Sequence, residues 1–321
     1  MSFVRVGAFA LGVILTPFAA SAVSLDAQTL MNTAVAISLG DFTTVNTAHV
    51  EGPTYIGGSV ASGTFDVNTD GLPSINVGGI TGGLIVGGDM TAHANTIIGG
   101  AQVGGTFTDT NSGASSSAVI TDHVDGIPVA AMTSLFTDLS GELSSLSTTL
   151  GASITGDMNN ISVVSGAGVD GIAVLNLDAT TAASYFTTNA LMNFSIDDDT
   201  TLIINVAGNF DTSYVTAKVN TDQPNVLFNF YEATTVTFGS QAWNASVLAP
   251  LATVSTPQGG VNGTVVAGEI RLGGEIRPYN NSNGFAGDLP TATPPVVPLP
   301  ASFVLLGSAG LALGAMRRRR R

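Results

Sequence analysis

Two stretches in the C-terminal half of the chain read alike: NASVLAPLATV runs from Asn244 to Val254, and NGTVVAGEIRL runs from Asn262 to Leu272. They start 18 residues apart, and in both an Asn and a small residue precede Ser or Thr, Val, an aliphatic residue and Ala. This period fits one turn of a small three-sided coil, which buries its apolar side only by stacking on its neighbours. The repeat therefore predicts a parallel β-solenoid, with a pair of β-hairpins as the alternative.

Glycine pairs extend this pattern into the N-terminal half. They occur at Gly57-Gly58, Gly78-Gly79, Gly82-Gly83, Gly87-Gly88, Gly99-Gly100 and Gly104-Gly105. Most follow a short apolar run and precede another, and because Gly permits positive φ and tight corners, the pairs indicate a coil with short sides. Runs rich in Val, Ile, Leu, Thr and Phe predict strands at 34–39, 84–86, 96–98, 161–164, 172–177, 201–206, 226–230 and 234–238. The predicted fold class is mainly β.

One long amphipathic helix interrupts the strands. Its apolar stripe consists of Met132, Leu135, Phe136, Leu139, Leu143, Leu146 and Leu150. Pro128 suits the first turn of such a helix, and Gly151 suits its end. So regular a stripe predicts a helix packed along the solenoid, with a partner-binding face as the alternative. Weaker helical patterns cover residues 178–192 and 25–32.

The N-terminus has the pattern of a secretory signal peptide. Arg5 supplies the positive region, residues 6–18 supply the apolar core, and Ala20 and Ala22 flank Ser21 in a small-residue cleavage site. We expect residues 1–22 to be removed and residues 23–289 to form the body of the protein. An uncleaved membrane anchor is the alternative.

The C-terminus combines a spacer, an apolar span and a basic end. Residues 290–298 form a Pro-rich spacer, and residues 297–321 form a tail. Within the tail, the 18 residues from Leu299 to Met316 are just long enough to cross a bilayer as one helix. The chain ends on Arg317, Arg318, Arg319, Arg320 and Arg321. By the positive-inside rule these arginines stay in the cytoplasm and leave the body outside.

The order of motif, span and basic stop resembles the exosortase-type sorting tails of Gram-negative bacteria, the PEP-CTERM class. The motif consists of Val297, Pro298, Leu299, Pro300 and Ala301, and it is similar to the VPLPA-CTERM variant. The Pro-Glu-Pro triplet of the main class is absent, so the processing enzyme stays open. The resemblance implies cleavage by an exosortase-type membrane protease, after transient anchoring in the inner membrane, and delivery to the cell surface or extracellular matrix. A plain single-span anchor is the alternative.

Composition excludes several classes of protein. The chain has no cysteine, so disulfide frameworks and thiol chemistry are absent. Only Lys218, Arg271 and Arg277 lie within the body, against all 23 acidic residues of the chain. A nucleic-acid binder needs a basic face, and this balance has the opposite sign. No nucleophile elbow or metal-ligand spacing of histidines occurs, so we expect no enzyme activity.

The body resembles the bacterial choice-of-anchor A family. The matching stretches, in family order, lie at 39–42, 50–60, 225–233, 247–250, 262–267 and 287–290. The resemblance implies an exported surface module with an adhesive role and a fold similar to the ice-binding-like β-solenoids. It implies no enzyme activity and no particular ligand.

One segment matches the opening half of a calcium loop. Asp66, Asn68 and Asp70 alternate and are followed by Gly71, but position 12 is Val77 instead of a bidentate Glu. A calcium-stabilised turn and a plain polar turn are the two interpretations. Calcium is the one cofactor that we consider.

The sequence thus favours an exported, non-catalytic surface or matrix protein with an adhesive or structural role. The alternatives are an ice-binding-like module and a calcium-dependent module that binds a glycan or surface. Ice binding needs threonines in register over several turns. Thr106, Thr108 and Thr110 alternate, as do Thr235 and Thr237, but the 18-residue repeat does not visibly stack them.

Overall fold

The computed structural model describes residues 25–45, 47–111, 118–157, 160–186, 191–197, 200–212, 224–256, 258–279 and 284–290. The body forms one compact unit that ends at Leu289. The predicted cleavage site at Ala20 and Ala22, the sorting motif at 297–301 and the arginines at 317–321 lie outside the described residues. Within those residues, no helix is both long and apolar enough to cross a membrane. The predicted C-terminal span therefore stays a prediction.

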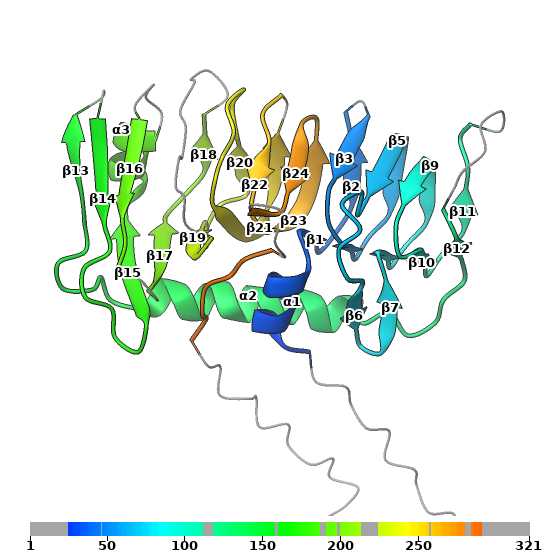
Figure 1. Cartoon of the computed structure of the whole chain (residues 1–321), viewed down its shortest axis with the longest axis horizontal. Coiled ribbons are helices and arrows are strands. Elements are labelled where there is room, and N and C mark those ends of the chain that lie inside the picture. The colour runs from blue at the N-terminus through cyan, green and yellow to red at the C-terminus, as the bar shows by residue number, and fades with distance from the viewer. Residues whose placement is uncertain are drawn as a thin grey trace, which may run out of the picture. The chain divides into compact units, whose positions relative to one another are not determined.

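The body is a parallel coil in which short strands recur on three faces (Figure 1). We call the first face the sheet that contains, in spatial order, β12 (Ile120–Thr121), β10 (Ala101–Val103), β8 (Leu84–Val86), β4 (Thr54–Ile56), β1 (Ala36–Ser38), the first part of β23 (Val265–Leu272), the first part of β21 (Ser246–Thr256), β19 (Val226–Asn229), β17 (Thr201–Val206) and β15 (Ile172–Leu177). The predicted parallel β-solenoid is confirmed.

The other two faces are built by the same coils. The second face contains β11 (Phe107–Thr108), the first part of β9 (Met90–Ile97), the first part of β5 (Val60–Val67), β2 (Phe42–Thr44), the second parts of β23 and β21, β20 (Thr235–Thr237) and β18 (Phe210–Asp211). The third face contains the ends of β9 and β5, β3 (Ala48–Val50), β24 (Glu275–Arg277) and β22 (Val261–Asn262).

The two repeat copies pair as neighbouring turns of this coil. Val247 lies opposite Val265, which is the predicted offset, and the pairing is parallel. The hairpin alternative is wrong, because hairpin strands pair antiparallel. Beyond the Ala of each copy the register shifts, so that Thr253 pairs with Glu269 and not with Arg271. The ungapped alignment therefore holds for the first half of the repeat only.

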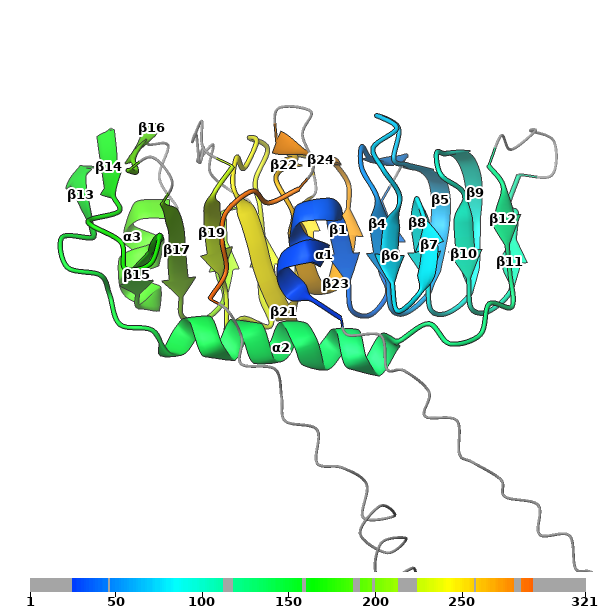
Figure 2. The same ribbon diagram turned by 60° about the horizontal axis from the view of Figure 1, so that its bottom comes forward.

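The two halves of the chain meet in the middle of the stack. β1 pairs with β4 on one side and with β23 on the other, so Ala36 lies between Thr54 and Val265. From β1 the N-terminal strands stack in one direction, and helix α2 (Val129–Ser145) then runs back beneath the middle of the stack, where it contacts β21, β19 and β17 (Figure 2). The C-terminal strands return from the far end to β1. Closing the stack therefore requires contacts between residues at opposite ends of the sequence.

Helix α2 lies along the first face, as its stripe predicts. Met132, Phe136, Leu139 and Leu143 are buried against that face. The predicted end at Gly151 is wrong, because the helix ends at Ser145 and Leu150 is 93% exposed. Two leucines of the predicted stripe lie beyond the helix: Leu146 is its C-cap and still packs against the core, whereas Leu150 continues the spacing by chance.

Two shorter helices and two small sheets complete the described part. Helix α1 (Ala27–Thr33) has Asp26 as its N-cap, whose carboxylate accepts the Thr29 N–H at 2.7 Å. Helix α3 (Ala179–Phe186) is shorter than the predicted 178–192, because the residues from Leu191 form a strand. The added sheets contain β13 (Ser153–Asp157), β14 (Asn160–Val164) and β16 (Leu191–Ser195) at one end of the stack, and the hairpin of β6 (Ile75–Val77) and β7 (Ile80–Gly82).

Most corner glycines serve close stacking instead of positive φ. Gly57, Gly87 and Gly104 do not have positive φ, unlike Gly78-Gly79 and Gly99-Gly100. A Cβ on Gly87 would overlap the carbonyl oxygen of Gly57, and one on Gly104 would overlap that of Gly87. The expectation that these pairs supply positive φ is thus wrong for the corners between the first and second faces, where successive backbones approach too closely for a side chain.

Candidate binding surface

The first face is covered and carries no open surface in its central part. Its outward side chains include Ile85, Tyr55, Ile37, Val266 and Leu248, which pack against α1 and α2 in a second hydrophobic core. The Tyr55 hydroxyl is buried with no hydrogen-bond partner in the described part, and burial raises the pKa of this phenol.

Farther along the first face the outward residues change from apolar to Asn. Asn205 donates through Nδ2 to the Leu143 carbonyl and to Asn176 Oδ1, each at 2.7 Å. Asn229 donates to Asn205 Oδ1 at 2.8 Å and to the Ser140 carbonyl at 3.0 Å. This asparagine ladder joins three neighbouring strands to the end of α2 and satisfies backbone carbonyls there.

The second face is uncovered in the described part, and its outward residues form two columns. In the first column, Thr253 lies between Thr235 and Glu269. The second column reads, rung by rung, Thr108, Thr91, Ala61, Thr43, Arg271, Ser255, Thr237 and Asp211. The residues between the columns, such as Val60 and Ile270, point inward and are buried. The second face therefore presents mainly hydroxyl groups.

At the N-terminal end of the first column, side chains bond to the backbone of the next turn. Asp41 Oδ1 accepts the Ser59 N–H at 2.8 Å, Ser59 Oγ accepts the Asp89 N–H at 3.1 Å, and Asp89 Oδ1 accepts the Thr106 N–H at 2.8 Å. This explains why Asp, Ser or Thr follows the corner glycines. The sequence contained this signal, since the pairs Gly57-Gly58, Gly87-Gly88 and Gly104-Gly105 each precede such a residue, but the pattern could not show which turn the side chain contacts.

The middle of the second face carries its one described cation. Arg271 and Glu269 are alternate residues of β23, so both side chains point outward. The Arg271 Nη2 and Glu269 Oε2 atoms lie 4.0 Å apart, and the side chains are 60% and 47% exposed. Thr253 Oγ1 donates to Glu269 Oε2 at 3.3 Å. This pair interrupts the hydroxyl columns where the two halves of the chain meet.

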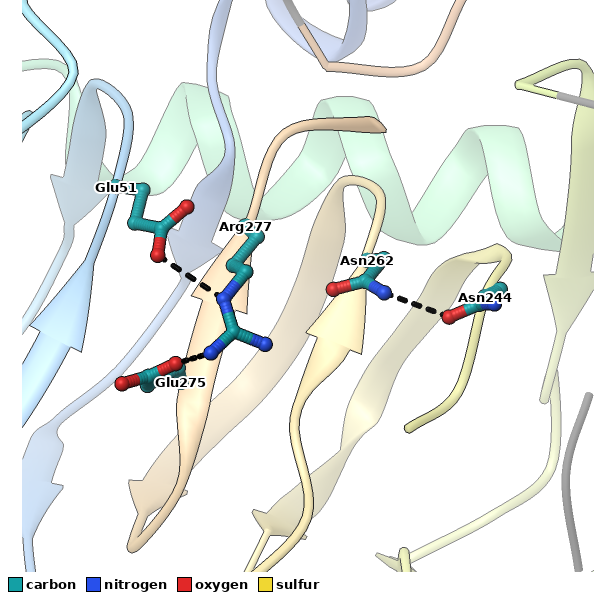
Figure 3. A network of polar contacts seen from close by, with 5 residues as sticks. All are labelled: Glu51, Asn244, Asn262, Glu275 and Arg277. Carbon is teal, nitrogen blue, oxygen red and sulfur yellow. Dashed lines mark hydrogen bonds and ion pairs between the residues drawn. The ribbon is translucent and has the colours of Figure 1, made fainter. Parts of the chain in front are cut away.

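The third face carries polar side chains that bond to one another (Figure 3). Arg277 Nε donates to Glu51 Oε1 at 3.0 Å, and the same guanidinium pairs with Glu275. Asn262 Nδ2 donates to Asn244 Oδ1 at 2.6 Å, so equivalent asparagines of the two repeat copies bond directly. The Arg277 pair ties the first described coil to the last one.

The residues of the predicted calcium loop have separate partners. Asp66 is buried and bonds Asn95 at 3.0 Å and His49 at 3.3 Å. Asn68 donates to the Leu72 and Ile98 carbonyls, whereas Asp70 is exposed. Among the described residues, no three His, Cys, Asp or Glu side chains are placed to hold a metal ion. Calcium binding stays a prediction, which melting temperatures with and without millimolar calcium would test.

Comparison with known proteins agrees with this architecture. The family model described as "Putative Ice-binding-like adhesive domain" matches residues 35–278. This description fits the resemblance to the choice-of-anchor A family. No curated protein matches the chain.

Two solved structures are similar at low identity. The ice-binding protein 1 DUF3494 domain of Shewanella frigidimarina is 14% identical, over 81% of this chain and 99% of that one, with a TM-score of 0.32. An ice-binding protein from the Antarctic ascomycete Antarctomyces psychrotrophicus is also 14% identical, over 80% of this chain and 100% of that one, with a TM-score of 0.27. Because its family model covers most of the described body, the chain belongs to the family of ice-binding-like adhesive domains.

Proposed function

We propose that this chain is an exported, non-catalytic surface or matrix protein and that it adheres through the second face. The observation that supports this is the pair of outward columns in register on a face that no described element covers. A parallel coil holds such side chains about 4.8 Å apart from rung to rung, so they present a rigid, repeated array of hydrogen-bonding groups. The central part of the first face cannot serve, because α1 and α2 cover its outward residues.

Binding by the isolated body tests this assignment. Both hydrophobic cores lie within residues 30–289, so residues 23–289 can be produced without the end segments. Thr91→Arg and Thr237→Arg place bulky charges on the second face, whereas Thr133→Arg places one on the exposed side of α2. We expect the two second-face variants to lose binding to immobilised cell-surface extracts and the α2 variant to keep it. Equal retention of all three would contradict the proposal.

Export and sorting by an exosortase-type system complete the proposal. The motif, span and arginine run of the sequence support it. The body between the two end segments has its first and last described residues in contact. Gln28 donates to the Gly287 carbonyl at 2.7 Å and accepts the Leu289 N–H at 2.5 Å. Mass spectrometry of the mature termini in fractionated cells tests this. An intact tail in every fraction would contradict processing.

Ice binding is the second candidate, and one observation favours it. Contrary to the expectation from the repeat, threonines do stack: Thr108 on Thr91, and Thr235 on Thr253. An exposed ion pair interrupts the columns, however, and charges bind water strongly. Thermal hysteresis of residues 23–289 equal to that of an inert control protein would remove this candidate.

A further inference from the structure

The exposed ion pair on the second face has the chemistry of a sugar site. We propose that Glu269 and Arg271, with Thr43 and Ser255 beside them, bind neutral sugars by hydrogen-bonding adjacent hydroxyl groups. This inference rests on the proposed adhesive function of the second face and names its ligand class.

Stability does not explain the position of this pair. Both side chains are about half exposed or more, and the closest approach of their charged atoms is 4.0 Å. Such surface pairs contribute about 0–1 kcal/mol, because water screens the charges and two long side chains must be ordered. The comparable Arg277, in contrast, has a second partner in Glu51 and joins two coils. Arg271 has no such structural task in the described part.

The neighbours of Arg271 supply complementary hydrogen-bonding groups. Thr43 and Ser255 are its register partners on the adjacent strands, about 4.8 Å to either side. Their hydroxyls can donate or accept, the guanidinium only donates, and the Glu269 carboxylate only accepts. Adjacent sugar hydroxyls each carry one donor and two lone pairs, so a carboxylate and a guanidinium side by side can bond both.

Charge and hydration favour a neutral sugar over other ligands. An acidic polymer would meet Glu269 here and the carboxylates of Asp41 and Asp211 on the same face, in a body where acids far outnumber bases. An apolar solid would leave both charges desolvated without hydrogen bonds, which is unfavourable. A neutral polyol replaces the lost water hydrogen bonds and adds no charge.

The described outward columns contain no aromatic side chain on which a sugar ring could stack. We therefore expect weak binding of a single sugar and stronger binding of a polymer, because the columns let several units bind at once.

Affinity electrophoresis of residues 23–289 on neutral and acidic polysaccharides tests the proposal. The probes are dextran, soluble cellulose and galactomannan, with alginate as the acidic polymer. Glu269→Gln and Arg271→Ala remove one charged partner each. Glu275→Gln is the matched control, since Glu275 also lies two positions from an arginine but on the third face. Circular dichroism verifies that all variants are folded.

We expect at least one neutral polymer to retard the body and both second-face variants to weaken that binding about tenfold, the effect of losing one charged hydrogen bond. Glu275→Gln should change it less than about twofold. Retardation by alginate alone, equal binding of all variants, or no retardation by any neutral polymer would overturn the sugar site. If cell-surface extracts still retain the body in those cases, the adhesive function of the second face stands without it.

Discussion

The first and second faces are built from the same turns of one coil, yet one is core and the other is surface. On both, alternate residues point inward, and the outward residues decide the difference. Ile37, Tyr55 and Val266 on the first face are apolar and fully buried beneath helices. Thr91, Thr43 and Thr237 on the second face are polar and meet no helix in the described part.

The comparison shows that the residue types in an outward column depend on what packs over that face of the solenoid. Where α2 reaches its last turns, the column changes to Asn176, Asn205 and Asn229, because carbonyl groups there need donors. Where nothing covers the face, hydroxyls and charges occur. The following substitutions test this interpretation of the two faces.

The largest effect is expected where α2 packs on the first face. Phe136→Ala removes a fully buried ring and should lower the free energy of unfolding by about 3–5 kcal/mol, through lost burial and a cavity. Urea denaturation measures it. Leu150→Ala, at a residue that is 93% exposed, is the control and should change stability by less than about 0.5 kcal/mol. Equal effects would mean that α2 does not form a core with this face.

The second-largest loss of stability is expected in the asparagine ladder. Asn205→Ala removes three buried hydrogen bonds, to the Leu143 carbonyl, to Asn176 Oδ1 and from Asn229 Nδ2, and each such bond contributes about 1 kcal/mol. We expect a loss of about 3 kcal/mol in the same urea experiment. Asn193→Ala removes an exposed Asn–Asn bond to Asn160 and should cost far less. A small effect at Asn205 would show that the ladder is incidental.

Replacing a glycine by alanine should change stability in opposite directions at the corner between the two faces and in α2. Gly87→Ala places a methyl against the Gly57 carbonyl and should destabilise by about 1–3 kcal/mol. Gly141→Ala lies in α2 with open space around its Cβ and should stabilise by about 0.5–1 kcal/mol. Melting temperatures give both signs. Stabilisation by Gly87→Ala would refute the close stacking of the turns.

The smallest effect concerns pH at the end of the second face. The Asn111 N–H, with His93 as a further partner at 3.0 Å, lowers the pKa of Asp109 below its ordinary value. A carboxyl with a depressed folded pKa stabilises the protein above its ordinary pKa near 4, and this contribution is lost as pH falls through the lower value. Asp109→Asn should therefore lower the melting temperature slightly at pH 6 and not at pH 2. The same difference at both pH values would contradict this.

Much of the fold could be predicted from local pattern. The 18-residue repeat identified the coil because alternation and stacking are both short-range, and Val247 does pair with Val265. The helix stripe located α2 for the same reason. The end of α2 was mispredicted, because spacing alone does not show where packing against the first face stops.

The candidate site could be predicted only in part. The sequence shows the alternating threonines at 106, 108, 110, 235 and 237 but not which of them stack, because turn lengths vary. The hairpin of β6 and β7 lies between β4 and β8, which are neighbours in the sheet, and the register shifts within β21. Glu269 and Arg271 carried no signal in the sequence, since nothing local places them beside Thr43 and Ser255.

The sequence by itself determined an acidic, cysteine-free body made of short strands in a repeating pattern, because composition and periodicity are properties of neighbours in the chain. Only the tertiary structure decided that β1 closes on β23, which outward column α2 covers, and which hydroxyls stand in register on the open second face. These depend on contacts between residues far apart in the sequence, and such contacts are fixed only when the whole stack has formed.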